Sequence, residues 1–193
     1  MPISLPTFVS SFETSLRSSG LNGSMISQMS TALGSGMASI MATSVQVSTV
    51  DAGTSGVGTG YMVGIITTKK TDYTQMVSNL HSNGVSGSYA NNLANALSDG
   101  VLKNLLSCAV STTHPIVGSG SGTVKFTMNP LQALPILQQS MASSGINGES
   151  SMKIANAFVF SLSSILSLTS MIIPIVGPTG GVSFTGIGSG KIV

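Results

Sequence analysis

A four-residue pattern, Gly-x-x-Gly, occurs three times along this chain at nearly even spacing. The copies are Gly20–Gly23, Gly84–Gly87 and Gly145–Gly148, offset by 64 and then 61 residues when the residue numbers are subtracted. Each copy follows an apolar pair at i, i+4 spacing, which places both side chains on one face of a helix. The pairs are Phe12 and Leu16, Met76 and Leu80, and Leu137 and Met141. Because the repeat fills the chain, it restricts the fold to three similar units.

The first glycine of each copy predicts a helix end, because glycine adopts the left-handed conformation at little cost. A longer helix follows each turn, with apolar residues at steps of 3, 1, 4 and 4 along one face. In the second unit these residues are Leu93, Ala96, Leu97, Val101 and Leu105. Three small residues correspond inside the longer helices: Gly36, Gly100 and Ser161. Small side chains at one fixed place predict the close approach of a neighbouring helix.

A glycine-rich turn between two β-prone runs ends each unit and predicts a β-hairpin. These turns lie at residues 57–60, 117–120 and, more loosely, 176–179. We therefore expect an α+β fold of three tandem repeats, each a helix-turn-helix followed by a β-hairpin. The three repeats are residues 1–68, 69–128 and 129–193, the last with an extended C-terminal tail. Units this small bury little surface alone, so we expect a pseudo-threefold body, with a linear array as the alternative.

Charged residues are scarce in this sequence. Twelve of the 193 residues are Asp, Glu, Lys or Arg, or 6%, and the net charge is +2. An ordinary soluble domain carries about 25%. The few basic residues are scattered, which argues against nucleic acid as a partner. A weakly charged surface predicts that the chain is covered by partners, copies of itself among them.

The single cysteine, Cys108, is predicted to be a small buried hydrophobe. A catalytic thiol needs a neighbouring base, and the chain has two histidines, His81 and His114. Nothing local places either histidine beside the thiol. An enzyme subunit whose site forms between chains therefore remains an alternative and not the main prediction.

The acidic residues lie in different parts of the repeat and do not converge. Glu13 with Arg17, and Asp99 with Lys103, have the i, i+4 spacing of helix-surface ion pairs. Glu149 suits the first turn of its helix, where negative charge is favourable. Acid–base or metal chemistry needs groups that converge. The sequence therefore predicts no enzyme activity, no cofactor and no metal site.

One segment, residues 155–176, is uncharged and long enough to span a membrane. Its counterpart in the second repeat, residues 91–104, is a plainly amphipathic helix. Equivalent units share one environment, so the third helix is expected to be more deeply buried, in the core or in a subunit contact. A membrane-active protein, holin-like or pore-forming, is the alternative.

The low charge, the few aromatic residues, the Gly-x-x-Gly turns and the glycine-rich end at 186–193 together resemble virion structural proteins of tailed bacteriophages. The resemblance covers the whole chain, and it lies in the general character of the sequence and not in a diagnostic motif. It implies a non-enzymatic virion protein, such as a capsid decoration protein or a neck or tail component. The implied partners are other virion proteins and copies of this chain, while a membrane is not an expected partner.

Five residues are predicted to dock on partners. Met128 and Met171 lie outside the predicted helices, where a flexible apolar side chain suits an adaptable contact. Ile187, Ile192 and Val193 belong to the C-terminal tail, which we expect to extend as a docking arm.

Overall fold

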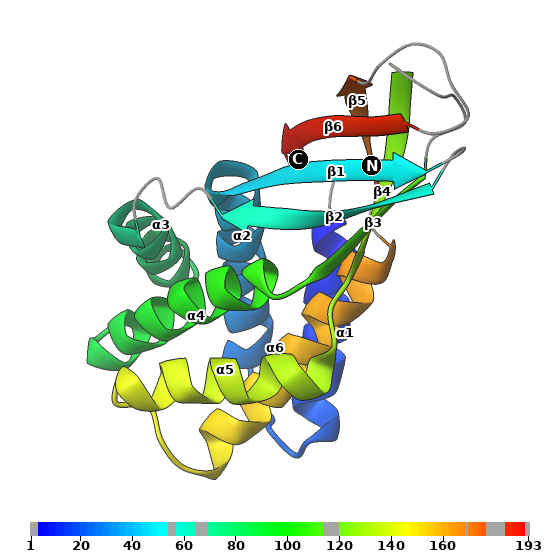
Figure 1. Ribbon diagram of the computed structural model, residues 1–193. Coiled ribbons are helices and arrows are strands. Elements are labelled where there is room, and N and C mark those ends of the chain that lie inside the picture. The colour runs from blue at the N-terminus through cyan, green and yellow to red at the C-terminus, as the bar shows by residue number, and fades with distance from the viewer. Residues whose placement is uncertain are drawn as a thin grey trace.

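In the part of the chain that the structure describes, six helices, joined in three pairs, form the larger part (Figure 1). The computed structural model describes residues 4–53, 57–64, 69–113, 120–168, 170–176 and 184–191, and the surroundings of the side chains at 4–41, 73–110 and 125–168. The helices are α1 (Leu5–Ser18), α2 (Met25–Ser44), α3 (Lys69–Ser82), α4 (Ser88–Leu106), α5 (Pro130–Ser143) and α6 (Glu149–Leu168). A short turn that contains the Gly-x-x-Gly pattern joins the two members of each pair.

The turn between paired helices has the conformation that the glycines predict. Gly20, Gly84 and Gly145 have φ angles of 87°, 81° and 77°. The next residue donates its backbone N–H five residues back, which ties the helix end in a Schellman motif. These bonds join Leu21 to Leu16 at 3.1 Å, Val85 to Leu80 at 2.9 Å and Ile146 to Met141 at 2.9 Å. The sequence prediction of a helix end at each first glycine is therefore confirmed.

The helices contact one another in chain order, and α1 also contacts α6, so the six form a closed ring. Small residues permit the close contacts between pairs. A Cβ atom on Gly100 would lie 2.5 Å from Cδ1 of Leu137 in the next pair, and Gly36 faces Met76 in the same way. At the third such place the hydroxyls of Ser161 and Ser11 are hydrogen-bonded at 3.1 Å. The predicted close approach at the small residues is confirmed.

Six strands lie at one end of the helices (Figure 1). They are β1 (Val45–Gly53), β2 (Val57–Gly64), β3 (Ala109–Thr113), β4 (Gly120–Thr127), β5 (Ser170–Val176) and β6 (Phe184–Lys191). Each strand pairs antiparallel with its neighbours in chain order, and β1 also pairs with β6, which closes a barrel.

The predicted fold class, an α+β body of three repeats that each end in their own hairpin, is wrong. The part of the chain whose side chains are described is mostly helical. Of its buried apolar side chains, all but six lie in helices, the exceptions being Val85, Cys108, Val110, Phe126, Met128 and Ile146. The two strands of each repeat do pair with each other, β1 with β2, β3 with β4 and β5 with β6. They are not separate hairpins, because β2 also pairs with β3 and β4 also pairs with β5. A lone hairpin leaves unpaired N–H and C=O groups at its edges, and pairing between units satisfies them.

The C-terminal stretch predicted to be a free docking arm is also different in the structure. Through Lys191 it forms β6, which pairs with β1 from Gln46↔Lys191 to Gly53↔Phe184. Its backbone therefore pairs with another strand of the same chain, and the stretch is the last strand of the barrel.

Replacing Gly20 by alanine should lower the free energy of unfolding by about 1 kcal/mol, because an L-residue with a side chain is strained at this positive φ. No atom lies within 4 Å of the added Cβ, so the backbone conformation alone causes the loss. Urea denaturation measures the change. Gly20→Asn is the control and should lose less, since asparagine tolerates the left-handed region. Equal stability of Gly20→Ala and the unaltered protein would contradict the assignment.

Candidate docking site

The structure separates Cys108 from His81, one of the two histidines that could have formed a thiol site. Cys108 follows the end of α4 and is 6% exposed, and its thiol donates a hydrogen bond to the Asn104 carbonyl at 3.4 Å. Burial raises the pKa of the Cys108 thiol to about 12. His81 is exposed in α3, beside the turn that precedes α4. The 19 residues of α4 separate its two ends by about 28 Å. His114 lies outside the described residues.

The acidic side chains with described surroundings take part in separate ion pairs. Arg17 binds Glu13 at 2.8 Å and Lys103 binds Asp99 at 2.6 Å, which confirms both predicted pairs. Lys153 binds Glu149 at 2.8 Å in the first turn of α6. These pairs belong to three different helix pairs. Among the described residues, no group of three His, Cys, Asp or Glu side chains could hold a metal ion.

The predicted docking residues occupy several different places. Met128 follows β4 and is 5% exposed, so its side chain packs within this chain and offers no surface to a partner. Met171 lies in β5 and Ile187 in β6, where backbone pairing is described. Ile192 and Val193 lie outside the described residues. A docking role for these last four remains a prediction.

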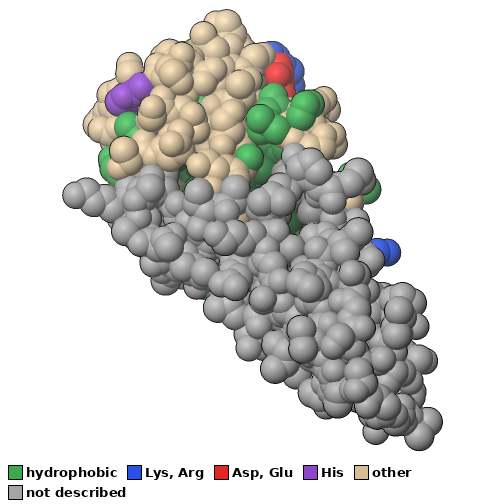
Figure 2. Space-filling view, turned by 90° about the horizontal axis from the view of Figure 1, so that it is seen from above, with side chains coloured by type: hydrophobic (Ala, Val, Ile, Leu, Met, Phe, Trp, Pro, Cys, Tyr) green, Lys and Arg blue, Asp and Glu red, His purple; other side chains and the backbone are tan. Residues whose placement is uncertain are grey.

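The described surface is poor in charge, as the composition predicts. Figure 2 shows the helical part from above, with most of its described side chains neither acidic nor basic. Hydrophobic side chains gather at one edge of this view, beside an acidic and a basic group. Such a surface favours contacts made by shape and apolar area over contacts made by charge.

The outer side of α6 carries large exposed apolar side chains. Met152 is 54% exposed, Phe160 is 51% exposed and Leu168 is 68% exposed. Together with Asn156 and Ser164 they form one row at i, i+4 spacing, which we call the α6 ridge. Such a row winds around the helix, since four residues turn about 40° past a full turn, so Met152 and Leu168 lie about 80° to either side of Phe160. Phe160 lies at its centre.

The α6 ridge was missed at the sequence level, although the repeat contains a signal for it. Counted from the Gly-x-x-Gly turns, Phe160 corresponds to Ser35 in α2 and to Asp99 in α4. A phenylalanine thus occupies a position that is polar in the other two pairs. The apolar composition of α6 led to the expectation of deeper burial. Its inner side, which includes Ile154 and Phe158, is buried in the core as expected. Burial of the ridge in a subunit contact, the other form of that expectation, remains a prediction.

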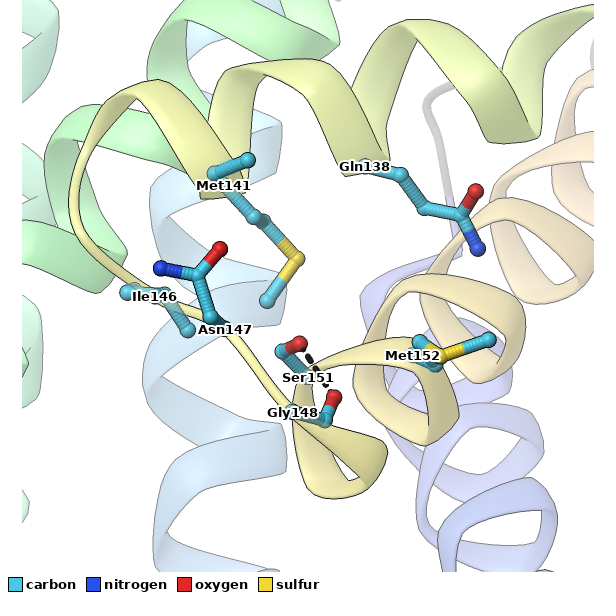
Figure 3. Close-up of a pocket in the computed structure, with 8 residues that line it drawn as sticks. Gln138, Met141, Ile146, Asn147, Gly148, Ser151 and Met152 are labelled. Atoms are coloured by element: carbon cyan, nitrogen blue, oxygen red, sulfur yellow. Dashed lines mark hydrogen bonds between the residues drawn. The ribbon is translucent and has the colours of Figure 1, made fainter.

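A pocket of about 250 Å³ lies at the turn between α5 and α6 (Figure 3). Its lining includes Met141, Ile146 and Met152, together with Gln138 and Asn147, whose side chains end in amides. Met141 and Ile146 are buried, whereas Met152 is half exposed and begins the α6 ridge. The pocket is therefore continuous with that ridge.

The polar groups at this turn are fixed by local hydrogen bonds. The Ser151 hydroxyl donates to the Gly148 carbonyl at 2.6 Å, as the dashed line in Figure 3 marks. Lys153 hydrogen-bonds Glu149 and lowers the pKa of the Glu149 carboxyl, first by that bond and then by its charge. The pair neutralises the one acidic and one basic side chain of α6. The lining of the pocket therefore combines apolar side chains with two neutral amides.

The chain matches no protein-family model, and comparisons with curated proteins and with solved structures found no match either.

Cys108 should resist alkylation in the folded protein at pH about 8, because a thiol with a pKa near 12 holds almost no thiolate there. Mass spectrometry after treatment with iodoacetamide measures the modification. The unfolded protein in concentrated urea is the control and should react fully, since this is the one cysteine of the chain. Rapid alkylation without unfolding would contradict the buried placement.

Proposed function

We propose that this protein is a non-enzymatic structural protein of a viral particle, which docks on a capsid or on a tail or neck assembly and stabilises it. The observation that carries the proposal is the α6 ridge. Met152, Phe160 and Leu168 are each more than half exposed on the outer side of a helix whose inner side already packs against α1 and α5.

Aromatic side chains and methionine are enriched in the surfaces where proteins dock. A partner that covers Phe160 removes its ring from water. This burial stabilises the complex by about 25 cal/mol for each Å² of apolar surface buried. The surroundings of the ridge suit this role, because Asn156 and Ser164 are neutral and already donate hydrogen bonds to the Met152 and Phe160 carbonyls. Docking is therefore the activity that the outer side of α6 supports best.

The viral setting rests on the resemblance of the sequence to virion structural proteins of tailed bacteriophages. The scarcity of charge agrees with it, since a protein held in a particle does not depend on its own charge for solubility. Copies of this chain and other virion proteins are the proposed partners.

A membrane-active role is the second candidate, and α6 is the observation that favours it. Among the described residues, α6 is the one helix long and apolar enough to cross a membrane, judged by length and composition. Of the window that meets this test, 56% is buried inside the protein. Ile154, Phe158 and Leu162 would have to leave the core for α6 to insert. Docking leaves that core intact and is the simpler use of the same helix.

Phe160→Ser should weaken docking by about tenfold or more, because it removes the central apolar group of the ridge. Sedimentation equilibrium of the purified protein measures self-association, and co-sedimentation with the native assembly measures docking on other proteins. The stability of the isolated chain should change by less than about 0.5 kcal/mol, since the side chain is exposed.

Leu131→Ser is the matched control, because Leu131 is 79% exposed at the start of α5 and lies outside the α6 ridge. It should leave both measurements unchanged. Equal docking of Phe160→Ser and the unaltered protein would remove the basis of the proposal. Flotation with liposomes that is lost in Phe160→Ser would favour the membrane-active role instead.

A further inference from the structure

We propose that the pocket between α5 and α6 receives one apolar side chain, of leucine or methionine size, from an uncharged peptide segment of a partner protein. The inference rests on the proposed docking function and specifies what the partner presents at the N-terminal end of the α6 ridge. Three features support it: the filled counterpart of the pocket in another helix pair, the neutral lining, and the size.

The chain fills the corresponding place between α1 and α2 with its own side chain. There the Arg17 guanidinium donates to Glu13 at 2.8 Å and to the Ser27 hydroxyl of α2 at 3.4 Å. Ser27 also donates to Glu13 at 2.7 Å. The Ser27 hydroxyl and the Arg17 guanidinium hold the pKa of the Glu13 carboxyl below its usual value. A long side chain thus bridges the two helices.

In the third pair the bridging side chain is absent. Arg17 and Ala142 both lie three residues before the first glycine of their turns, so the alanine occupies the place of the arginine. The neighbours correspond in the same way, Glu13 to Gln138 and Ser27 to Met152. The second pair has His81 at this place. The pocket is therefore the space that a side chain occupies elsewhere in the same protein, which makes another side chain a fitting occupant.

The lining of the pocket decides the chemistry of that occupant. All of the residues that line it are uncharged, so it offers no counter-charge to an ion. Met141, Ile146 and Met152 supply the large apolar side chains of the lining, and methionine adapts its shape to irregular apolar groups. Gln138 and Asn147 each carry one amide that can donate and accept, which matches the N–H and C=O groups of a peptide backbone. The lining therefore selects an apolar side chain between neutral peptide bonds.

The size of the pocket suits a small group, such as a side chain with its flanking peptide bonds, better than a drug-sized molecule. Its volume of about 250 Å³ lies below the range of about 300–1,000 Å³ that is usual for small-molecule sites. The opening also leads directly onto Met152 of the α6 ridge. A partner segment that lies along the ridge would thus reach the pocket with its end.

The experiment uses N-acetyl-leucine-N-methylamide, a leucine side chain between two peptide bonds, as the probe. The full-length protein carries ¹³C-methyl methionine, so NMR follows Met141 and Met152 directly. We expect saturable shifts of both methyl signals, with a Kd in about the millimolar range for a probe this small. The lysine and aspartate counterparts of the probe should not shift them.

Two variants fill the pocket, and one is a matched control. Ala142→Arg copies the first helix pair and Ala142→Leu fills the space without charge, so each should weaken binding of the probe at least about tenfold. Residue 142 is exposed on α5, and Arg17 is already accommodated at the corresponding place, so both variants are expected to fold. Ser143→Arg adds the same charge at an exposed neighbour outside the pocket and should bind the probe as the unaltered protein does.

Three results would overturn the inference: no saturable shift of the two methyl signals, equal binding by the Ala142 variants, or equal binding of the charged probes. The outcome is separable from that of the proposed function. If Phe160→Ser loses docking but the probe does not bind, this inference alone fails. If the probe binds but Phe160→Ser docks normally, the proposed function alone fails.

Discussion

The contact between α1 and α6 is the interaction on which the rest of the structure depends. Phe158 of α6 packs edge-on against Phe8 and Phe12 of α1, with ring centroids 5.3 and 5.7 Å apart. Edge-to-face pairs of this kind are favourable beyond the area they bury. Beside them the hydroxyls of Ser11 and Ser161 join residues 150 positions apart. This contact closes the ring, so that every helix has a neighbour on both sides.

Closure of the ring determines which surfaces are left for partners. Because α1 and α5 cover the inner side of α6, its remaining apolar residues face outward as the α6 ridge. The helix pairs share one plan but differ in how their turns are filled. Arg17 fills the turn of the first pair, whereas Ala142 leaves the turn of the third pair open. The two features proposed for docking, the α6 ridge and the pocket, thus lie where the α5–α6 pair differs from the other two helix pairs.

Local features of the fold could be predicted, and contacts between units could not. The apolar pairs before each turn, such as Phe12 and Leu16, are buried as their spacing predicts. The ion pairs of Glu13 with Arg17 and of Asp99 with Lys103 follow from i, i+4 spacing within one helix. The fold class was wrong because a strand pattern indicates pairing across a nearby turn, as in β1 with β2, but not pairing between repeats, as in β2 with β3 and β1 with β6. The burial of Met128 was missed for a related reason, since it depends on neighbours distant in sequence.

The sequence by itself determined the helix pairs and the places where they turn. The spacing of apolar residues along a helix and the positive φ of glycine at a helix end depend only on a few neighbouring residues. Both can therefore be recognised in the sequence without the rest of the fold. Only the tertiary structure decided that the strands close into one barrel, that Phe160 stays exposed while Phe158 is buried, and that a pocket opens beside Ala142. Each of these depends on which distant segment covers a given side, and burial becomes defined only when the whole ring has packed.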